Sequence, residues 1–279
     1  MRDRGKKGFS RRTFLWGDTL ASGLGVTALA LVAGFISLPI VSLILWTISE
    51  DSWRAMASPL ARDALLLSMR TTAISMFIIV LVGTPAAYVL ARADFRGKRF
   101  LDALIDIPAV LPPSAAGIAL LLTFGRFGLV GKYFDAFGVT ISFTTAAVVI
   151  AEIFVAAHFY VRQASVGFSS VRRDVEEAAM VDGAGRFTVF TKVTVPLAFP
   201  ALVAGALTAW ARALGEFGAT IIFAGSFGGI TQTIPLAIFA EFQSDIDAAV
   251  ALSVLVLGFA FGVILAVRYL TARIATHEA

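Results

Sequence analysis

Few residues of this 279-residue chain have types and spacing that could carry out covalent chemistry. A phosphate-binding loop requires the pattern G-x-x-x-x-G-K-[ST]. The nearest approach, around Gly131-Lys132-Tyr133, lacks both the first glycine and the final Ser or Thr. Cysteine is absent, and the two histidines, His158 and His277, are too few for a metal site. The sequence therefore predicts no catalytic residue, no metal ligand and no cofactor held by this chain.

Two charged residues, Arg212 and Glu216, interrupt a long apolar stretch. Residues four apart share a helix face, and charges inside a membrane normally face protein or water. One interpretation is a pair that lines a path for a polar solute near its outer end. The other is a mutually neutralising pair that packs a dimer, and the sequence favours neither.

The segment EEAAMVDGAGRFTVFTKVTVPLAFP, residues 176–200, has the pattern of a rigid surface knob. It begins with a predicted short amphipathic helix, in which Val175, Ala178 and Ala179 have acidic neighbours. Two glycines, Gly183 and Gly185, then permit a sharp change of direction, and Pro196 is expected to open the next long helix. Small residues on such a knob allow another protein to approach closely. The plainer interpretation is a loop that merely connects two helices.

The elements around these residues are predicted to be membrane spans. Hydrophobic residues make up 58% of the chain and charged residues 15%, with a mean hydropathy of +0.85, and a membrane-crossing helix needs about 20 mostly apolar residues. The third span is expected to be broken or kinked, with protein covering the break, because Pro108, Pro112 and Pro113 fall inside it. The six predicted spans lie near residues 24–48, 66–91, 101–124, 142–163, 196–222 and 248–270.

The distribution of Lys and Arg predicts the orientation. Seventeen of the 23 lie in the amino-terminal tail, the second and fourth connections and the carboxyl end, and four lie in the remaining connections. The positive-inside rule then places both termini in the cytoplasm. The net charge of only +4 gives no reason to expect nucleic-acid binding. Residues 10–15, SRRTFL, are similar to a twin-arginine export signal, but the apolar stretch that follows is too long for a signal core.

The 176–200 segment resembles the EAA motif of ABC-importer permeases, which reads EAA, three residues, Gly, nine residues and then I-x-L-P. Here Glu177-Ala178-Ala179 precede Gly183, and Val193-Thr194-Val195-Pro196 follow at the expected spacing, with Val in place of Ile and Leu. The resemblance implies that Glu177, Ala178, Ala179, Gly183 and Pro196 belong to a loop that docks onto an ATPase subunit.

That resemblance also implies an all-α transmembrane, six-span type I ABC-importer permease (MetI-like) fold in the cell inner membrane. The implied organisation is a basic tail at 1–20, a first span and extracytoplasmic loop at 21–62, and the permease domain at 63–279, with its coupling loop at about 172–195. The implied partners are an ABC ATPase dimer that binds ATP and Mg²⁺, a second copy of this chain, an extracytoplasmic oxyanion-binding protein and membrane lipid. The chain itself is expected not to be an enzyme.

A narrower resemblance concerns the substrate. The stretches ARALGEFGATIIFAG and TQTIPLAIF are similar to those of molybdate and tungstate permeases, with sulfate or thiosulfate permeases as the alternative. In these stretches the candidate pathway or gate residues are Arg212, Glu216, Thr220, Thr231 and Gln232. Two other classes are an ion-coupled secondary transporter and a non-transporting scaffold. The EAA spacing argues against both, and no repeated half, typical of secondary transporters, is visible.

The charge asymmetry makes a testable prediction about topology. Reporters that distinguish the two sides of the membrane, fused after Ala279 and beside Asp51, should report opposite sides, because an even number of spans brings the carboxyl end back to the side of the basic tail. The same answer from both fusions would contradict the six-span arrangement.

Overall fold

The computed structural model describes residues 19–47 and 50–277, and the chain divides into two units, residues 1–48 and 49–279, which are treated separately. Residues 1–18, with most of the predicted basic tail and the SRRTFL motif, lie outside the described residues. The first unit contains helix α1 (Thr19–Trp46). Its Gly23–Trp46 portion is long and apolar enough to cross a membrane and corresponds to the first predicted span.

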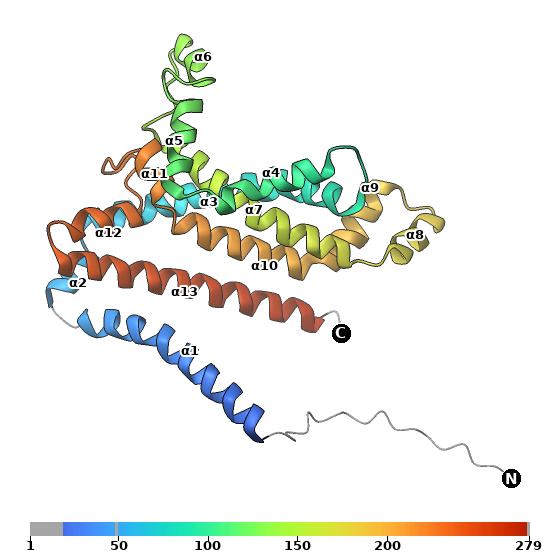
Figure 1. Cartoon of the computed structure of the whole chain (residues 1–279), viewed down its shortest axis with the longest axis horizontal. Coiled ribbons are helices and arrows are strands. Elements are labelled where there is room, and N and C mark those ends of the chain that lie inside the picture. The colour runs from blue at the N-terminus through green and yellow to red at the C-terminus, as the bar shows by residue number, and fades with distance from the viewer. Residues whose placement is uncertain (1–18, 48–49, 278–279) are drawn as a thin grey trace. The chain divides into compact units, whose positions relative to one another are not determined.

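Four long helices form the frame of the second unit: α3 (Pro59–Arg92), α7 (Thr145–Ser170), α10 (Val195–Leu214) and α13 (Ile246–His277) (Figure 1). Helix α7 packs against both α3 and α10. Their shared apolar cluster contains Tyr160 and Phe168, which are almost completely buried. By length and composition, the described residues contain five candidate spans, or six if one bent pair of helices counts as a span. The all-α, multi-span prediction is therefore confirmed.

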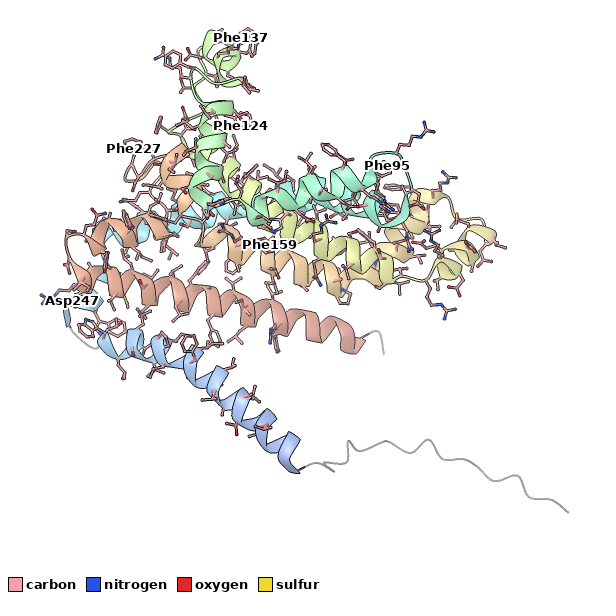
Figure 2. All side chains as sticks on the ribbon, in the orientation of Figure 1. Phe95, Phe124, Phe137, Phe159, Phe227 and Asp247 are labelled. Atoms are coloured by element: carbon pink, nitrogen blue, oxygen red, sulfur yellow. The ribbon has the colours of Figure 1, made fainter. Side chains whose placement is uncertain are left out.

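Short helices cluster at the two ends of this frame. One end carries α2 (Glu50–Met56) and α12 (Ile234–Phe242), and the other carries α8 (Arg173–Val181) and α9 (Arg186–Val189) (Figure 1). Figure 2 shows Asp247 at the first end and Phe95 toward the second. Helix α6 (Gly131–Ala136), with Phe137 just beyond it, lies away from the long helices.

The third span is broken as predicted. Helix α4 (Lys98–Val110) and helix α5 (Pro113–Phe124) meet at an angle of 116°. Pro108 is tolerated inside α4, whereas the consecutive Pro112 and Pro113 end one helix and start the next, because proline fixes φ and donates no hydrogen bond. The prediction that protein covers the break is met on one side only: Leu111 packs against an apolar cluster, and Pro112 is exposed on this chain.

The fifth span differs from the predicted continuous helix over 196–222. Helix α10 ends at Leu214, and a separate helix, α11 (Gly218–Phe223), follows a three-residue break. The break begins at Gly215, where helix propensity is low. At the start of α10, Pro196 is the second residue of the helix, as predicted for a proline near a helix start. However, α10 does not begin after a loop, because a π-helix at Phe190–Thr194 connects α9 directly to α10.

Helices α7 and α10 are in close contact where Gly167 leaves no side chain between them. A Cβ atom added to Gly167 would lie 2.5 Å from Cβ of Ala201 on α10, a separation that real Cβ contacts do not reach. The packing of the central helices therefore depends on the missing methyl group at this position.

Gly167→Ala should lower the thermal unfolding temperature of the purified protein in detergent, although alanine is the better helix former. The expected cost of the overpacked contact is about 1–3 kcal/mol. The matched control is Gly262→Ala in α13, where an added Cβ meets nothing within 4 Å and no loss of stability is expected. Equal unfolding temperatures for the two variants would contradict the close-packing argument.

Candidate functional site

The predicted knob is built from α8, a glycine turn and α9. Helix α8 ends in a Schellman motif, in which the Gly183 N–H donates to the Met180 carbonyl and the Ala184 N–H to the Ala179 carbonyl, each at 3.0 Å. Gly183 has φ of 90°, in the left-handed region that favours glycine, whereas Gly185 has φ of −68°. Nothing lies within 4 Å of a Cβ added to Gly183. Its backbone conformation, not crowding, therefore requires glycine.

The outer surface of this segment carries apolar side chains among its exposed charged residues. Of the motif residues, Glu177, Ala178, Gly183 and Pro196 are exposed and Ala179 is half-buried. Large apolar side chains beside them are also exposed: Val181 at 87% and Phe187 at 79%, with Met180 and Val175 less so. We call the exposed residues Glu177, Ala178, Met180, Val181, Gly183 and Phe187 the docking face. Val181 and Phe187 were not predicted as site residues, although their apolar character in a charged connection was a usable signal.

The inner surface of the same segment is held by Glu176, which was predicted only as an acidic neighbour of the apolar residues. Its side chain is buried against the end of α3 and the start of α10. Oε1 of Glu176 accepts hydrogen bonds from Arg92 Nη2 at 2.9 Å and from Thr194 Oγ1 at 2.6 Å. The arrangement fixes one face of α8 and leaves the docking face free.

The junction of α10 and α11 contains the predicted Arg212 and Glu216. Although the helix ends between them, Arg212 Nη1 and Glu216 Oε2 lie 2.6 Å apart, and the Glu216 side chain is 1% exposed. The other carboxylate oxygen, Oε1, accepts the Ala219 N–H at 2.7 Å, which satisfies a free donor in the first turn of α11. In this conformation Glu216 is part of the interior and Arg212, at 29%, is partly exposed.

The three remaining pathway candidates lie in two places. Thr220 is in α11 and fully buried, and its hydroxyl has no hydrogen-bond partner among the described residues. Thr231 and Gln232 belong to the turn before α12, where both N–H groups donate to the Phe227 carbonyl. Thr231 is buried and Oγ1 accepts the Phe227 N–H at 2.9 Å, so it closes the turn, while Gln232 is half-buried.

A third buried carboxylate, Glu152 of α7, was not singled out as a candidate. It is 2% exposed, and its two oxygens accept hydrogen bonds from Thr71 and Ser75 of α3, both at 2.7 Å. The group thus joins the two central helices. Among the described residues no three His, Asp or Glu side chains come together as they would around a metal ion.

Comparison with known proteins agrees with this architecture. Residues 79–276 match the family described as "Binding-protein-dependent transport system inner membrane component". The molybdenum transport system permease protein ModB of Mycobacterium tuberculosis is 45% identical over 233 residues, covering 84% of this chain and 88% of that protein. ModB of Escherichia coli is 35% identical over 78% of this chain and 96% of its own length. A probable sulfate transport system permease protein, cysT of Chlorokybus atmophyticus, is 31% identical over 84% of this chain and 83% of its own length.

Solved structures of ABC transporters have the same fold. A bacterial transporter involved in alginate import superimposes with a TM-score of 0.72 at 16% identity, covering 91% of this chain and 96% of that chain. The MetNI methionine transporter in an inward-facing conformation gives a TM-score of 0.56 at 20% identity, covering 83% and 100%. The predicted type I, MetI-like fold is confirmed by these likenesses.

The Glu216 contacts make a stability prediction. Glu216→Ala should destabilise the protein in detergent by about 3–5 kcal/mol, because Arg212 loses its partner and the Ala219 N–H loses its acceptor. The control is Asp135→Ala, which removes the half-buried partner of the exposed Arg126, 3.1 Å away, and should change stability by less than about 1 kcal/mol. An unfolding temperature of Glu216→Ala as high as that of the control would contradict a structural role.

Proposed function

Because this chain belongs to the family of binding-protein-dependent transport system inner membrane components, we propose that it is the permease subunit of an ATP-driven importer of molybdate. Molybdate is proposed as the substrate because this chain is 45% identical to a molybdenum transport permease over 84% of its length. The chain is a multi-pass protein of the inner membrane and a transport subunit, not an enzyme. Tungstate, a dianion of the same tetrahedral shape, is proposed as a second cargo.

ATP hydrolysis is assigned to a separate subunit that binds ATP and Mg²⁺, since this sequence has no phosphate-binding loop. The docking face supports the proposal that this ATPase binds at α8 and α9. Exposed apolar side chains such as Val181 and Phe187, beside small residues and charged ones, suit a protein partner better than water. An ATPase bound there would be in the cytoplasm, which agrees with the positive-inside rule, since that rule predicts that the docking face and both termini are cytoplasmic.

Two copies of the chain are proposed to form the pathway about a two-fold axis, as most homo-oligomers are closed and symmetric. An oxyanion-binding protein would deliver the anion at the opposite end of the helices, where α2 and α12 lie (Figure 1). One solved relative of the fold is an alginate transporter in complex with a substrate-bound periplasmic protein, which supports this kind of partner in general.

The proposed mechanism is alternating access. ATP closes the ATPase dimer, the two docking faces move together, and the spans change from inward-open to outward-open. Since coupling between sites is reciprocal, ATP and the loaded binding protein must favour the same state. Arg212, Glu216, Thr220, Thr231 and Gln232 remain the proposed pathway or gate residues. The partly exposed Arg212 supports this proposal, because a guanidinium already paired with Glu216 would hold a passing anion weakly enough to release it.

The substrate is tested in proteoliposomes that hold this chain, its ATPase and its binding protein. Molybdate or tungstate at micromolar levels should stimulate ATP hydrolysis, and a large excess of sulfate should not compete. Gly183→Arg, which places a bulky cation on the docking face at a positive φ, should abolish the stimulation while the chain stays in the membrane. If sulfate alone stimulated hydrolysis, the chain would be an ABC permease with a different cargo, as the 31% identity to a sulfate permease allows.

A further inference from the structure

Two adjacent glutamates of α8 lie in opposite environments. Glu177 is exposed on the docking face, whereas Glu176 is 8% exposed and turned toward the membrane helices. Adjacent residues of a helix point about 100° apart, so one can contact a partner protein while the other contacts the interior. The two carboxylates therefore have different roles: Glu177 is available to a partner protein, and Glu176 contacts the membrane helices.

The interior partners of Glu176 come from two different long helical segments. Arg92 is the last residue of α3, and its Nη2 donates to Glu176 Oε1 and also to the Val171 carbonyl, both at 2.9 Å. Thr194 is the last residue of the π-helix that continues into α10, is fully buried, and donates to the same Oε1 at 2.6 Å. One carboxylate oxygen thus joins α3, α8 and the start of α10.

Aromatic contacts hold the remaining half of the segment to α3 and α7. The Phe190 ring, at the start of the π-helix, lies 4.8 Å from the Tyr88 ring of α3 and 6.1 Å from the Phe168 ring of α7. Val189 is buried beside it. The segment that carries the docking face is therefore attached at two points to α3, and it is not a freely hinged loop.

We propose that Glu176 is the positioning residue that makes the membrane helices follow the docking face. This inference rests on the proposed function and assigns Glu176 a part in it. When the ATPase displaces α8, the Glu176 contacts pull on the ends of α3 and α10 directly. Without the paired carboxylate, α8 could still bind the ATPase through the docking face, but its displacement would be absorbed by movement of the segment itself.

The test is the amount of molybdate imported per ATP hydrolysed, because a purely structural role would leave this ratio unchanged in the complexes that assemble. Glu176→Gln keeps the size of the side chain and removes its charge. The variant should still co-purify with the ATPase. In proteoliposomes with the ATPase and binding protein it should still hydrolyse ATP, while the amount of molybdate imported per ATP should fall by about fivefold or more, the fold-change that a typical coupling between two sites produces.

Matched variants separate coupling from docking and from folding. Glu177→Gln, one residue away on the docking face, should weaken co-purification of the ATPase and leave the ratio unchanged in the complexes that form. Asp94→Asn, which alters a carboxylate that is 97% exposed, should change neither. Thr194→Val, which loses the hydroxyl at constant volume, should lower the ratio, and Thr194→Ser should keep it near that of the wild type.

The possible results distinguish this inference from the proposed function. If the wild-type complex imports molybdate and both Glu176→Gln and Thr194→Val keep the wild-type ratio, the positioning role is wrong and the function stands. Loss of assembly in Glu176→Gln with an unchanged ratio in Thr194→Val would equally overturn it, since the contact would then serve folding only. If the wild-type complex imports sulfate instead, the ratio is measured with sulfate and the positioning role is tested all the same. A wild-type complex that imports none of molybdate, tungstate and sulfate would overturn the proposed function, and this inference with it.

Discussion

Lipid offers no hydrogen bonds, so each interruption of a helix in this chain needs its backbone groups satisfied from within. The interruptions meet this requirement in different ways. Pro112 and Pro113 remove two donors where α4 gives way to α5. Glu216 supplies an acceptor to the first turn of α11. Before Pro196 the chain winds as a π-helix, in which the Val195 N–H donates to the Phe190 carbonyl five residues earlier.

The same requirement governs the charged side chains of the central helices. Glu152 is paired with two hydroxyls of α3, and Arg162 of α7 binds Asp102 and Asp106 of α4 at 2.6–2.8 Å. Apolar contacts give little direction between helices in lipid, since the acyl chains are equally apolar. Polar cross-links and close approaches such as that at Gly167 therefore determine which helices pack together and in what register.

The sequence predicted most features of the fold that depend on neighbouring residues, and it missed those that depend on contacts between residues far apart in the chain. Hydropathy located the spans, consecutive prolines located the break after α4, and the spacing of Glu177, Gly183 and Pro196 located the knob. The break after Leu214 was missed because its signals, Gly215 and Gly218, lie within one continuous apolar stretch that is long enough to be read as a single span. Glu176 was missed because its partner Arg92 is 84 positions away in the chain, so no local pattern signals the contact.

The Glu176 contacts also give a physical reason for the fixed spacing of the motif. From Glu176 the chain runs along α8, reverses at the positive φ of Gly183, and returns through α9 and the π-helix to Thr194, whose hydroxyl closes the circuit on Glu176. Adding or removing a residue after Gly183 would rotate Thr194 by about 100° around its helix and open that circuit. The number of residues between Gly183 and Pro196 is therefore fixed by the hydrogen bond between Thr194 and Glu176, which closes the loop. The docking face can then vary at exposed positions such as Val181 and Phe187 without loosening its attachment to the membrane helices.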